Sequence, residues 1–446
     1  MDYKYSTVAE GIKRKIATGE YKAGSKLPSI QTLAKQLACN ADTVIKAYRQ
    51  LEAEHFVFAV PKSGFYVLKN KPGDIAGGAL DLVSVRPPEA VNPYKDYYHC
   101  MEKASVLYQE RLFEYAPPQG RPELIQVLVK HLTNFHIFTR PENVFVTSGA
   151  QQALYILATM PFEGRGGTVV LEQPTYGVML DLLRLAKTPV VGIRRTAAGI
   201  DLDELAAVFA CGDVKFLYLM PRYQNPTGFC YDDSQKRAIL KLAGRYGVYI
   251  VEDDYLADLE TDGKSDPLYA YGAQESVIHI QSFSKTLLPG LRLGMCVLPR
   301  PLHQAFLSCK RNIDLATPMI TQAALEIFLK SRMYRHHVQR IRRFYSGKMD
   351  VLREACRLVG ADADWHIPRS GIYAYRELAG RSGDKLVGRL LERGLRVSGV
   401  DDCYLPCFTH SGGLRLCVCN AEDDQLREAV ALVEKELAGL SRSGRA

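Results

Sequence analysis

Five short apolar segments of β type recur after about residue 80, and segments with helical periodicity lie between them. The five are N-V-F-V-T (143–147), G-T-V-V-L (167–171), V-K-F-L-Y-L (214–219), V-Y-I-V-E-D-D (248–254) and V-I-H-I-Q-S-F (277–283). This alternation predicts an α/β fold with a largely parallel sheet. Ligands of such folds bind outside the carboxyl ends of the strands. We therefore expect a ligand site among the polar residues that end or follow these segments.

Those residues supply the groups that a pyridoxal phosphate (PLP) site requires. The phosphate needs a helix N-terminus, hydroxyls and a cation, while the ring needs a carboxylate at its nitrogen, a stacking partner and a lysine for a Schiff base. The motifs that offer these groups are T-S-G-A-Q-Q-A-L (147–154), P-T-Y (174–176), Q-N-P-T-G (224–228), V-E-D-D-Y (251–255) and S-F-S-K-T-L-L-P-G-L-R-L-G (282–294). Each motif alone also has a purely structural explanation. Their ordered occurrence at strand ends predicts a cofactor site.

This constellation resembles the fold-type I aminotransferases of class I/II, over roughly residues 81–440. The resemblance implies a large domain with a mainly parallel sheet and a smaller C-terminal α+β subdomain. It implies aldimine chemistry at Lys285, which would form the Schiff base with PLP. It also implies that Asp253 pairs with the ring nitrogen, with Asp254 as the alternative. Arg415, in G-G-L-R-L (412–416), would bind the carboxylate of an amino acid.

The resemblance assigns further cofactor contacts. Tyr176 would stack on the ring, and Asn225 and Tyr255 would bond its phenolic oxygen. The phosphate would be held by Gly149, Ala150, Gln151, Ser282, Ser284 and Arg292. The run P-Q-G (118–120) is similar to the substrate-side loop of these enzymes.

The first seventy residues predict a separate small domain. Two helical patterns surround a four-residue turn, with Ser29 placed to cap a helix through Leu37 and with Asn40 or Asp42 placed to cap the next one. An earlier helix carries Val8, Ile12 and Ile16, with Gly19 at its end. The inward positions of the last helix are Val44, Ala47, Tyr48 and Leu51. A hairpin around Pro61–Gly64 follows, so the pattern is typical of a helix-turn-helix with a basic wing.

K-L-P-S-I-Q-T-L-A (26–34) and D-T-V-I-K-A-Y-R-Q-L-E (42–52) resemble the winged helix-turn-helix of the GntR family of bacterial regulators, over residues 4–68. Two positions depart from the family pattern. Gln31 stands where Arg is usual, and His55 stands where Gly is usual. The DNA-facing positions that the resemblance implies are Ser29, Gln31, Thr43, Lys46, Lys62 and Ser63; an ordinary solvent-exposed role remains the alternative for each.

The charge distribution separates the same two regions. Residues 1–71 contain twelve Lys/Arg and six Asp/Glu, so they account for most of the formal charge of +8. A small basic segment on a nearly neutral body favours a polyanion partner. The stretch K-N-K-P-G-D-I-A-G-G-A-L is typical of a flexible connection. We therefore expect a DNA-binding domain at 1–68, a linker at 69–80 and a PLP-binding domain at 81–446.

The eleven cysteines include no C-x-x-C pair, and the chain carries no signal-peptide core and no apolar stretch long enough to span a membrane. We therefore expect a cytoplasmic protein with reduced thiols. One group could form a thiolate–imidazole metal site, namely Cys403, Cys407, His410, Cys417 and Cys419. Burial of these side chains as small hydrophobic residues is the favoured interpretation, so no metal is expected.

A GntR-type domain fused to an aminotransferase-like domain resembles the MocR subfamily of bacterial transcription regulators. The resemblance implies a homodimer that binds operator DNA and senses PLP, an amino compound, or both. A functional aminotransferase with an accessory DNA-binding domain is the competing hypothesis, since the catalytic set is complete. A scaffold without PLP is a third, which predicts a colourless protein.

Overall fold

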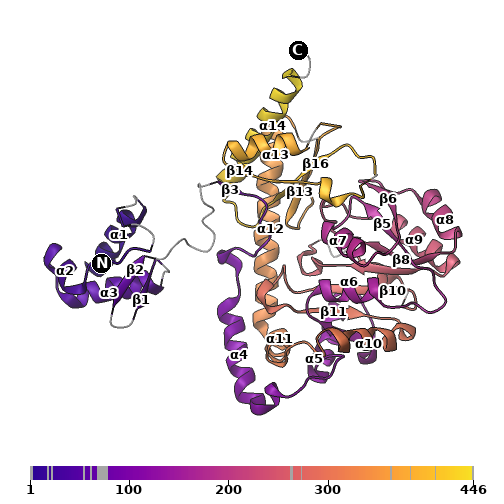
Figure 1. The fold of residues 1–446 in the computed structure, drawn as a ribbon, viewed down its shortest axis with the longest axis horizontal. Helices are drawn as coiled ribbons and strands as arrows, with labels where there is room; N and C mark the ends of the chain where they lie inside the picture. The colour runs from indigo at the N-terminus through magenta and orange to yellow at the C-terminus, as the bar shows by residue number, and fades with distance from the viewer. Residues whose placement is uncertain are drawn as a thin grey trace. The chain divides into compact units, whose positions relative to one another are not determined.

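The computed structural model divides the chain into two compact units, Met1–Ala79 and Leu80–Ala446. We call them the N-terminal and the C-terminal unit and describe each by itself (Figure 1). The residues that the structure describes are 4–17, 20–21, 24–53, 56–60, 63–67, 79–261, 265–272, 274–361, 364–381, 383–406 and 408–443.

The N-terminal unit contains three helices and a hairpin. They are α1 (Lys4–Ala17), α2 (Ile30–Gln36), α3 (Ala41–Ala53) and the antiparallel strands β1 (Val57–Val60) and β2 (Gly64–Val67). The Oγ of Ser29 caps α2 by accepting a hydrogen bond from the amide of Thr32 at 3.1 Å. Asn40 directly precedes α3, and Asp42 lies in its first turn. The four predicted inward residues of α3, Val44, Ala47, Tyr48 and Leu51, are fully buried, so the predicted winged helix-turn-helix is confirmed. Gly19, His55 and Pro61 lie outside the described residues.

The C-terminal unit is built on an eight-stranded sheet of order β4-β11-β10-β9-β8-β5-β6-β7. Its strands are β4 (Val144–Thr147), β5 (Thr168–Gln173), β6 (Val190–Thr196), β7 (Gly199–Ile200), β8 (Val214–Leu219), β9 (Tyr249–Asp253), β10 (Val277–Ser282) and β11 (Gly294–Val297). The neighbours from β10 to β6 are parallel. Parallel strands have both faces covered, so their sequences are almost continuously apolar. The predicted parallel sheet is confirmed.

Two hydrophobic clusters cover the two faces of this sheet. Successive residues of a strand point to opposite faces, and Ile250 of β9 accordingly packs in one cluster while Val251 packs in the other. The helices of this part are α4 (Tyr94–Tyr108), α5 (Pro122–Leu132), α6 (Ala150–Thr159), α7 (Gly177–Leu185), α8 (Leu202–Ala210), α9 (Asp233–Tyr246), α10 (His303–Ile313) and α11 (Met319–Lys330). Among the described residues, no helix has the length and apolar character needed to cross a bilayer.

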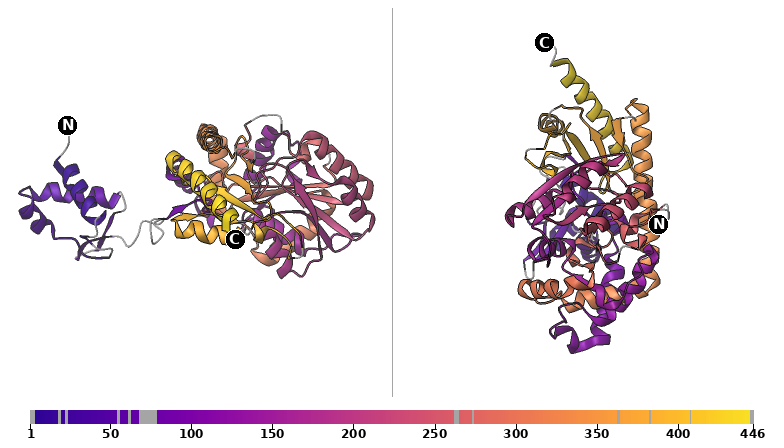
Figure 2. Two further views of the ribbon diagram at one scale, coloured as in Figure 1. Left: turned by 90° about the horizontal axis from the view of Figure 1, so that it is seen from above. Right: turned by 90° about the vertical axis from the view of Figure 1, so that its right-hand side faces the viewer.

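A smaller α+β part completes the C-terminal unit, as predicted. Its antiparallel sheet has the order β12-β13-β16-β15, and a parallel strand pair, β14 with β3, lies beside it. The strands are β3 (Leu80–Asp81), β12 (Trp365–His366), β13 (Tyr373–Glu377), β14 (Leu395–Arg396), β15 (Ser398–Gly399) and β16 (Gly413–Cys417). Its helices are α12 (Arg332–Leu358), α13 (Gly383–Glu392) and α14 (Asp423–Ser443). Figure 2 shows α12 along the outside of the unit in both views.

Candidate functional site

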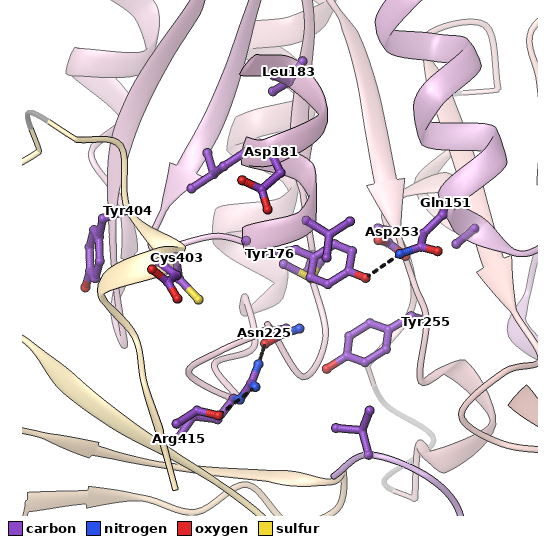
Figure 3. A pocket seen from close by; sticks show the side chains of 18 of the residues that line it. Gln151, Tyr176, Asp181, Leu183, Asn225, Asp253, Tyr255, Cys403, Tyr404 and Arg415 are labelled. Atoms are coloured by element: carbon purple, nitrogen blue, oxygen red, sulfur yellow. Dashed lines mark hydrogen bonds between the residues drawn. The ribbon is translucent and has the colours of Figure 1, made fainter. Parts of the chain in front are cut away.

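A cavity of about 1150 Å³ lies where the carboxyl ends of the parallel strands meet the smaller part of the C-terminal unit (Figure 3). Every residue that the sequence predicted for cofactor or carboxylate binding lines this cavity, except Gly149 and Asp254, the alternative to Asp253. The lining set from those predictions is Ala150, Gln151, Tyr176, Asn225, Asp253, Tyr255, Ser282, Ser284, Lys285, Arg292 and Arg415. The order β10-β9-β8-β5 in the sheet explains this convergence, because it brings the ends of distant segments to one edge.

One end of the cavity is suited to an anion. Gly149 caps the N-terminus of α6 with a φ of 80°, and a Cβ there would lie 2.7 Å from Nη2 of Arg292. Arg292 Nη1 donates to Oγ of Ser284 at 3.3 Å, and the Oγ of Ser282 accepts from the Ser284 amide at 3.2 Å. A helix N-terminus, hydroxyls and a guanidinium together attract a phosphate group.

Asp314 stabilises the segment around Gly149 at the N-terminus of α6. Its Oδ2 accepts hydrogen bonds from Ser148 Oγ at 2.8 Å and from Gln152 Nε2 at 2.6 Å. Lys310, whose side chain is fully buried, pairs with Oδ1 at 3.1 Å. The pKa of Asp314 is lowered because these hydrogen bonds and the Lys310 charge outweigh the effect of burial. The sequence motifs did not predict this support, since Asp314 lies far along the chain from the loop.

Lys285 lies three residues beyond the end of β10 and lines the cavity. No hydrogen bond or ion pair ties its amine to another described residue. Burial lowers its pKa, and the charges of Arg415 and Arg292 act in the same direction. A lysine with a lowered pKa is more often neutral, and a neutral amine is the form that attacks an aldehyde.

Asp253, the last residue of β9, is also buried in the cavity wall. The hydroxyl of Tyr218 donates to its Oδ2 at 2.9 Å, while its Oδ1 has no hydrogen-bond partner among the described residues. Burial raises the pKa of Asp253 to about 7. The carboxyl group therefore lacks a proton donor or a cation at one oxygen.

The neighbouring Asp254 is placed differently. It does not line the cavity, and both of its carboxylate oxygens bond the guanidinium of Arg222, with Nε to Oδ1 at 3.1 Å. Both partners of this ion pair are buried. Of the two acids that the sequence left as alternatives, only Asp253 faces the cavity.

Three predicted ring contacts lie close together but already have partners of their own (Figure 3). The hydroxyl of Tyr176 accepts from Gln151 Nε2 at 3.3 Å. Tyr255 donates its hydroxyl to the carbonyl of Tyr223 at 2.8 Å, and Asn225 Oδ1 accepts from Arg415 at 2.8 Å. The amide nitrogen of Asn225 is thus the donor still available to a phenolic oxygen, whereas Tyr255 would have to redirect its proton.

Arg415 lies on β16 at the opposite wall. Its guanidinium sits 4.7 Å from the ring centroid of Tyr373, and Nη2 donates to Oγ of Ser398 at 3.3 Å. No carboxylate forms an ion pair with it among the described residues. A guanidinium held by an aromatic face and neutral oxygens keeps its charge available to a carboxylate ligand.

The sequence motifs did not predict several residues of the cavity wall. Tyr373 and Ser398 hold Arg415, and Val83 and Val85 line the cavity just after the predicted linker. They belong to no recognised motif. The P-Q-G run at 118–120 does not line the cavity; Gln119 instead caps the start of β4 by donating to the carbonyl of Val144 at 2.9 Å.

The predicted DNA-facing residues of the N-terminal unit lie at or near its surface. Gln31 on α2 and Lys46 on α3 are exposed, and Thr43 is half-buried. Ser29 has a structural role as the cap of α2, and Ser63 bonds the hydroxyl of Tyr66 at 2.7 Å. Lys62 lies outside the described residues.

The cysteine and histidine group does not assemble in the part of the chain that the structure describes. No cluster of three or more His, Cys, Asp or Glu that could hold a metal ion occurs among those residues, and Cys407 lies outside them. Cys403, Cys417 and Cys419 are buried thiols.

Two families match the two units. Residues 4–67 match the gntR family of bacterial regulatory proteins, and residues 89–433 match aminotransferase class I and II. An HTH-type transcriptional regulator of Bacillus subtilis, YcxD, is 36% identical over 97% of this chain and 100% of its own length.

Enzymes are similar to the C-terminal part. The 2-aminoadipate transaminase of Thermus thermophilus is 31% identical over 84% of this chain and 92% of its own length. The structure of an α-aminoadipate aminotransferase from Thermus thermophilus, complexed with N-(5'-phosphopyridoxyl)-L-leucine, aligns with a TM-score of 0.73 and 25% identity. It covers 82% of this chain and 94% of its own.

Proposed function

Because this chain belongs to the aminotransferase class I and II family and carries a gntR-family domain at its N-terminus, we propose that it is a PLP-dependent DNA-binding transcription regulator of the MocR type. The observation that carries the proposal is the presence, in one chain, of a winged helix-turn-helix and of a cavity that both Lys285 and Asp253 line. The likeness to an HTH-type regulator over the full length supports it. Such a regulator works on chromosomal DNA in the cytoplasm.

The residues fit PLP. The unpartnered Oδ1 of Asp253 suits a protonated ring nitrogen, and the loop of Gly149 with Arg292 suits the phosphate. Lys285 would hold the cofactor covalently, and Tyr176 would cover its ring. When bound, PLP supplies an aldehyde that condenses with amines and a ring that withdraws electrons.

The signal in this proposal is PLP itself, a small amino compound, or both. Arg415 supports an amino acid, since its guanidinium faces the cavity without a carboxylate partner among the described residues. Lys285 would exchange its place at the cofactor with the amine of that ligand. Only a difference in ligand affinity between two conformations can then change DNA binding.

The contacts of residues 82–85, which follow the predicted linker and reach the cavity wall, support such coupling. Val83 and Val85 form part of the cavity wall, and Leu82 between linker and wall is fully buried. Leu82 donates to the carbonyl of Arg396 at 2.9 Å and accepts from the amide of Cys417 at 2.8 Å, two residues beyond Arg415. A ligand held by Arg415 would therefore act on the strands that anchor the linker. We place the domains at 1–68 and 81–446, with the linker at 69–80.

The proposal includes a homodimer. Large apolar side chains are exposed on α4 and the 3-10 helix Gln109–Phe113 that follows it, as expected of a surface that another subunit covers. They are Tyr94, Tyr98, Val106, Leu107, Phe113 and, just beyond, Tyr115. Analytical ultracentrifugation of the full chain tests this part.

An absorbance titration tests the function. The purified chain should be yellow, and an amino acid should change the visible spectrum of its cofactor; anisotropy with labelled DNA from upstream of its own gene should show tighter binding than to a scrambled duplex. A protein without cofactor absorbance, or one that does not distinguish the two duplexes, would contradict the proposal.

A working aminotransferase is the second candidate. The 31% identity to a 2-aminoadipate transaminase and the complete cavity set favour it. Steady conversion of an amino acid and a 2-oxoacid at ordinary enzyme rates, from roughly 1 to 1000 per second, would establish the enzyme. A single turnover that stops after one amino transfer would favour the regulator.

A further inference from the structure

The N-terminal half of α12 carries an unusual concentration of positive charge. Between Glu326 and Asp350 the sequence has no acidic residue but five arginines and two lysines, beside two histidines. Whereas the body of the chain is nearly neutral overall, this segment is strongly basic. The exposed members share one side of the helix at intervals of one turn: Arg332, Arg335, His336, Arg340 and Arg343. We call them the α12 basic face.

Helix stability does not account for these charges. The N-terminus of a helix has a partial positive charge, so cations in its first turn are unfavourable, and like charges four residues apart repel each other. The first turn of α12 has no acidic residue, and Arg332, Arg335 and His336 lie in or next to it. These charges therefore destabilise the start of α12, and a bound anion would remove that destabilisation.

The face is also without acidic partners among the described residues. Arg332, Arg335, Arg340 and Arg343 form no ion pair there, whereas Arg353 on the second half of α12 pairs with Asp350. Asp96 on α4 is the carboxylate beside the face. It joins His336, His337, Arg340 and Arg343 around a hollow of about 380 Å³, where one carboxylate faces two guanidinium groups.

We propose that the α12 basic face is a second DNA contact of this protein, which binds the phosphate backbone of duplex flanking the operator. The inference rests on the proposed function, since the DNA is brought by the N-terminal unit. Both units belong to one chain, so duplex held by the first is present at high effective concentration for the second. Guanidinium groups bind phosphates with charge-assisted hydrogen bonds and without sequence preference. α12 lies along the outside of its unit (Figure 2), and the five side chains of the face are exposed.

On the buried side of the same turn, two hydrogen bonds connect α12 to Thr286, the residue next to Lys285. Arg340 Nη2 donates to Nδ1 of His337 at 3.4 Å, and His337 donates from Nε2 to the carbonyl of Thr286, the neighbour of Lys285. His337 is buried, which lowers its pKa and keeps the ring neutral with its one proton on Nε2. A phosphate that draws Arg340 outward would break this chain of hydrogen bonds. The proposed face is therefore joined to the cofactor site by two hydrogen bonds.

The test uses the full chain loaded with PLP and labelled duplex from upstream of its own gene. In the test variant, Arg332, Arg335 and Arg343 are all changed to Gln, while Arg340 stays to preserve its hydrogen bond with His337. We expect at least tenfold weaker binding and a slope of log affinity against log salt that falls by about 0.9 for each phosphate that the variant no longer binds. Lengthening the duplex should tighten binding of the unmodified chain but not of this variant.

Two matched variants control for charge and folding. Changing the exposed Lys241, Arg245 and Arg357 to Gln removes the same charge elsewhere and should leave affinity nearly unchanged. Changing the three face residues to Lys keeps the charge and should retain most of the binding. The Gln variant should also melt no earlier than the unmodified chain, because the removed cations oppose the helix dipole.

Other results would contradict either the inference or the proposed function. Equal affinity and salt slope for the face variant and the control variant would overturn the inference. So would unchanged DNA binding together with weakened affinity for vesicles of phosphatidylserine. If the unmodified chain does not prefer the upstream duplex to a scrambled one, the proposed regulator fails, but the two Gln variants compared on scrambled duplex still test the face.

Discussion

The candidate functional residues of the two units lie differently with respect to the hydrophobic core. In the C-terminal unit, candidate residues such as Asp253 and Ser284 are themselves buried, and their positions depend on partners such as Tyr218. In the N-terminal unit, Gln31 and Lys46 are exposed above a core that does not include them. In the C-terminal unit the same residues therefore contribute to folding and to the candidate site. In the N-terminal unit the candidate residues are separate from the residues of the core. Substitutions should show large, all-or-none effects in the first and small, graded effects in the second.

The largest expected effect is that of Lys285→Ala. The covalent link to PLP requires this amine, so the visible absorbance of the purified protein should disappear entirely after dialysis. Since the lysine is desolvated and lacks an ion-pair partner among the described residues, the melting temperature of the cofactor-free chain should not fall. Lys285→Arg, which keeps the charge, should abolish the absorbance equally. A stable yellow Lys285→Ala protein would contradict the assignment.

Arg222→Ala should produce the largest loss of stability. It would leave the buried Asp254 without its cation, and breaking a buried pair in this way costs about 3–5 kcal/mol. Chemical denaturation measures the free energy of unfolding. The matched control is Arg427→Ala, which breaks exposed pairs with Asp424 and Glu354 and should cost at most about 1 kcal/mol. Similar losses in both variants would remove the distinction between buried and exposed charge.

Asp253 should make the stability of the cofactor-free chain depend on pH. Burial raises its pKa from 3.8 to about 7, so the folded state holds a proton that the unfolded state has already released. Stability from this group is therefore complete below pH 4 and is lost as the pH rises to about 7. Melting temperatures measured across that range should decline less in Asp253→Asn. Asp254→Asn, measured as the control, should decline as steeply as the unmodified chain. A decline as shallow as that of Asp253→Asn would contradict the assignment to Asp253.

In the N-terminal unit, Lys46→Gln should weaken DNA binding without altering the fold. Removal of one phosphate-binding cation lowers the slope of log affinity against log salt by about 0.9. Anisotropy titrations at several salt concentrations measure this change. Lys35→Gln, on the exposed side of α2, is the control for a general loss of charge. An unchanged salt slope for Lys46→Gln would remove this residue from the DNA-binding surface.

The smallest expected effect belongs to Ser29→Ala. Loss of the cap on α2 should cost about 1 kcal/mol of stability in the N-terminal unit. Ser29→Asp should retain most of the stability because its carboxylate also caps helices. Calorimetry of the full chain, with the transition of the smaller unit followed separately, measures the loss. If Ser29→Ala weakens DNA binding while Ser29→Asp restores it, the cap explains the effect of this residue on DNA.

The sequence predicted the part of the cavity that is formed at strand ends, because its motifs stand there. Neighbouring residues at a strand end were harder to separate: the choice between Asp253 and Asp254 depended on Arg222, which lies on another strand connection. Tyr218 was missed because a tyrosine in a buried strand looks like packing, and only the sheet order shows that it meets Asp253. Val83 belongs to no motif, and its place in the cavity wall follows from the tertiary fold alone. The exposed residues predicted to face DNA had no comparable constraint, and their prediction rested on family likeness.

The pairing of β3 with β14 has a consequence for dynamics. This strand pair is two residues long, and its described backbone bonds on the linker side are those of Leu80 and Leu82. So short a ladder can open without unfolding the sheet beside it, because local opening costs less free energy than global unfolding. The amide protons of Leu80 and Leu82 should then exchange with solvent faster than those of β9. If the cavity controls DNA binding as proposed, the rate at which the β3–β14 pair opens would limit how quickly a change in the cavity affects the N-terminal unit.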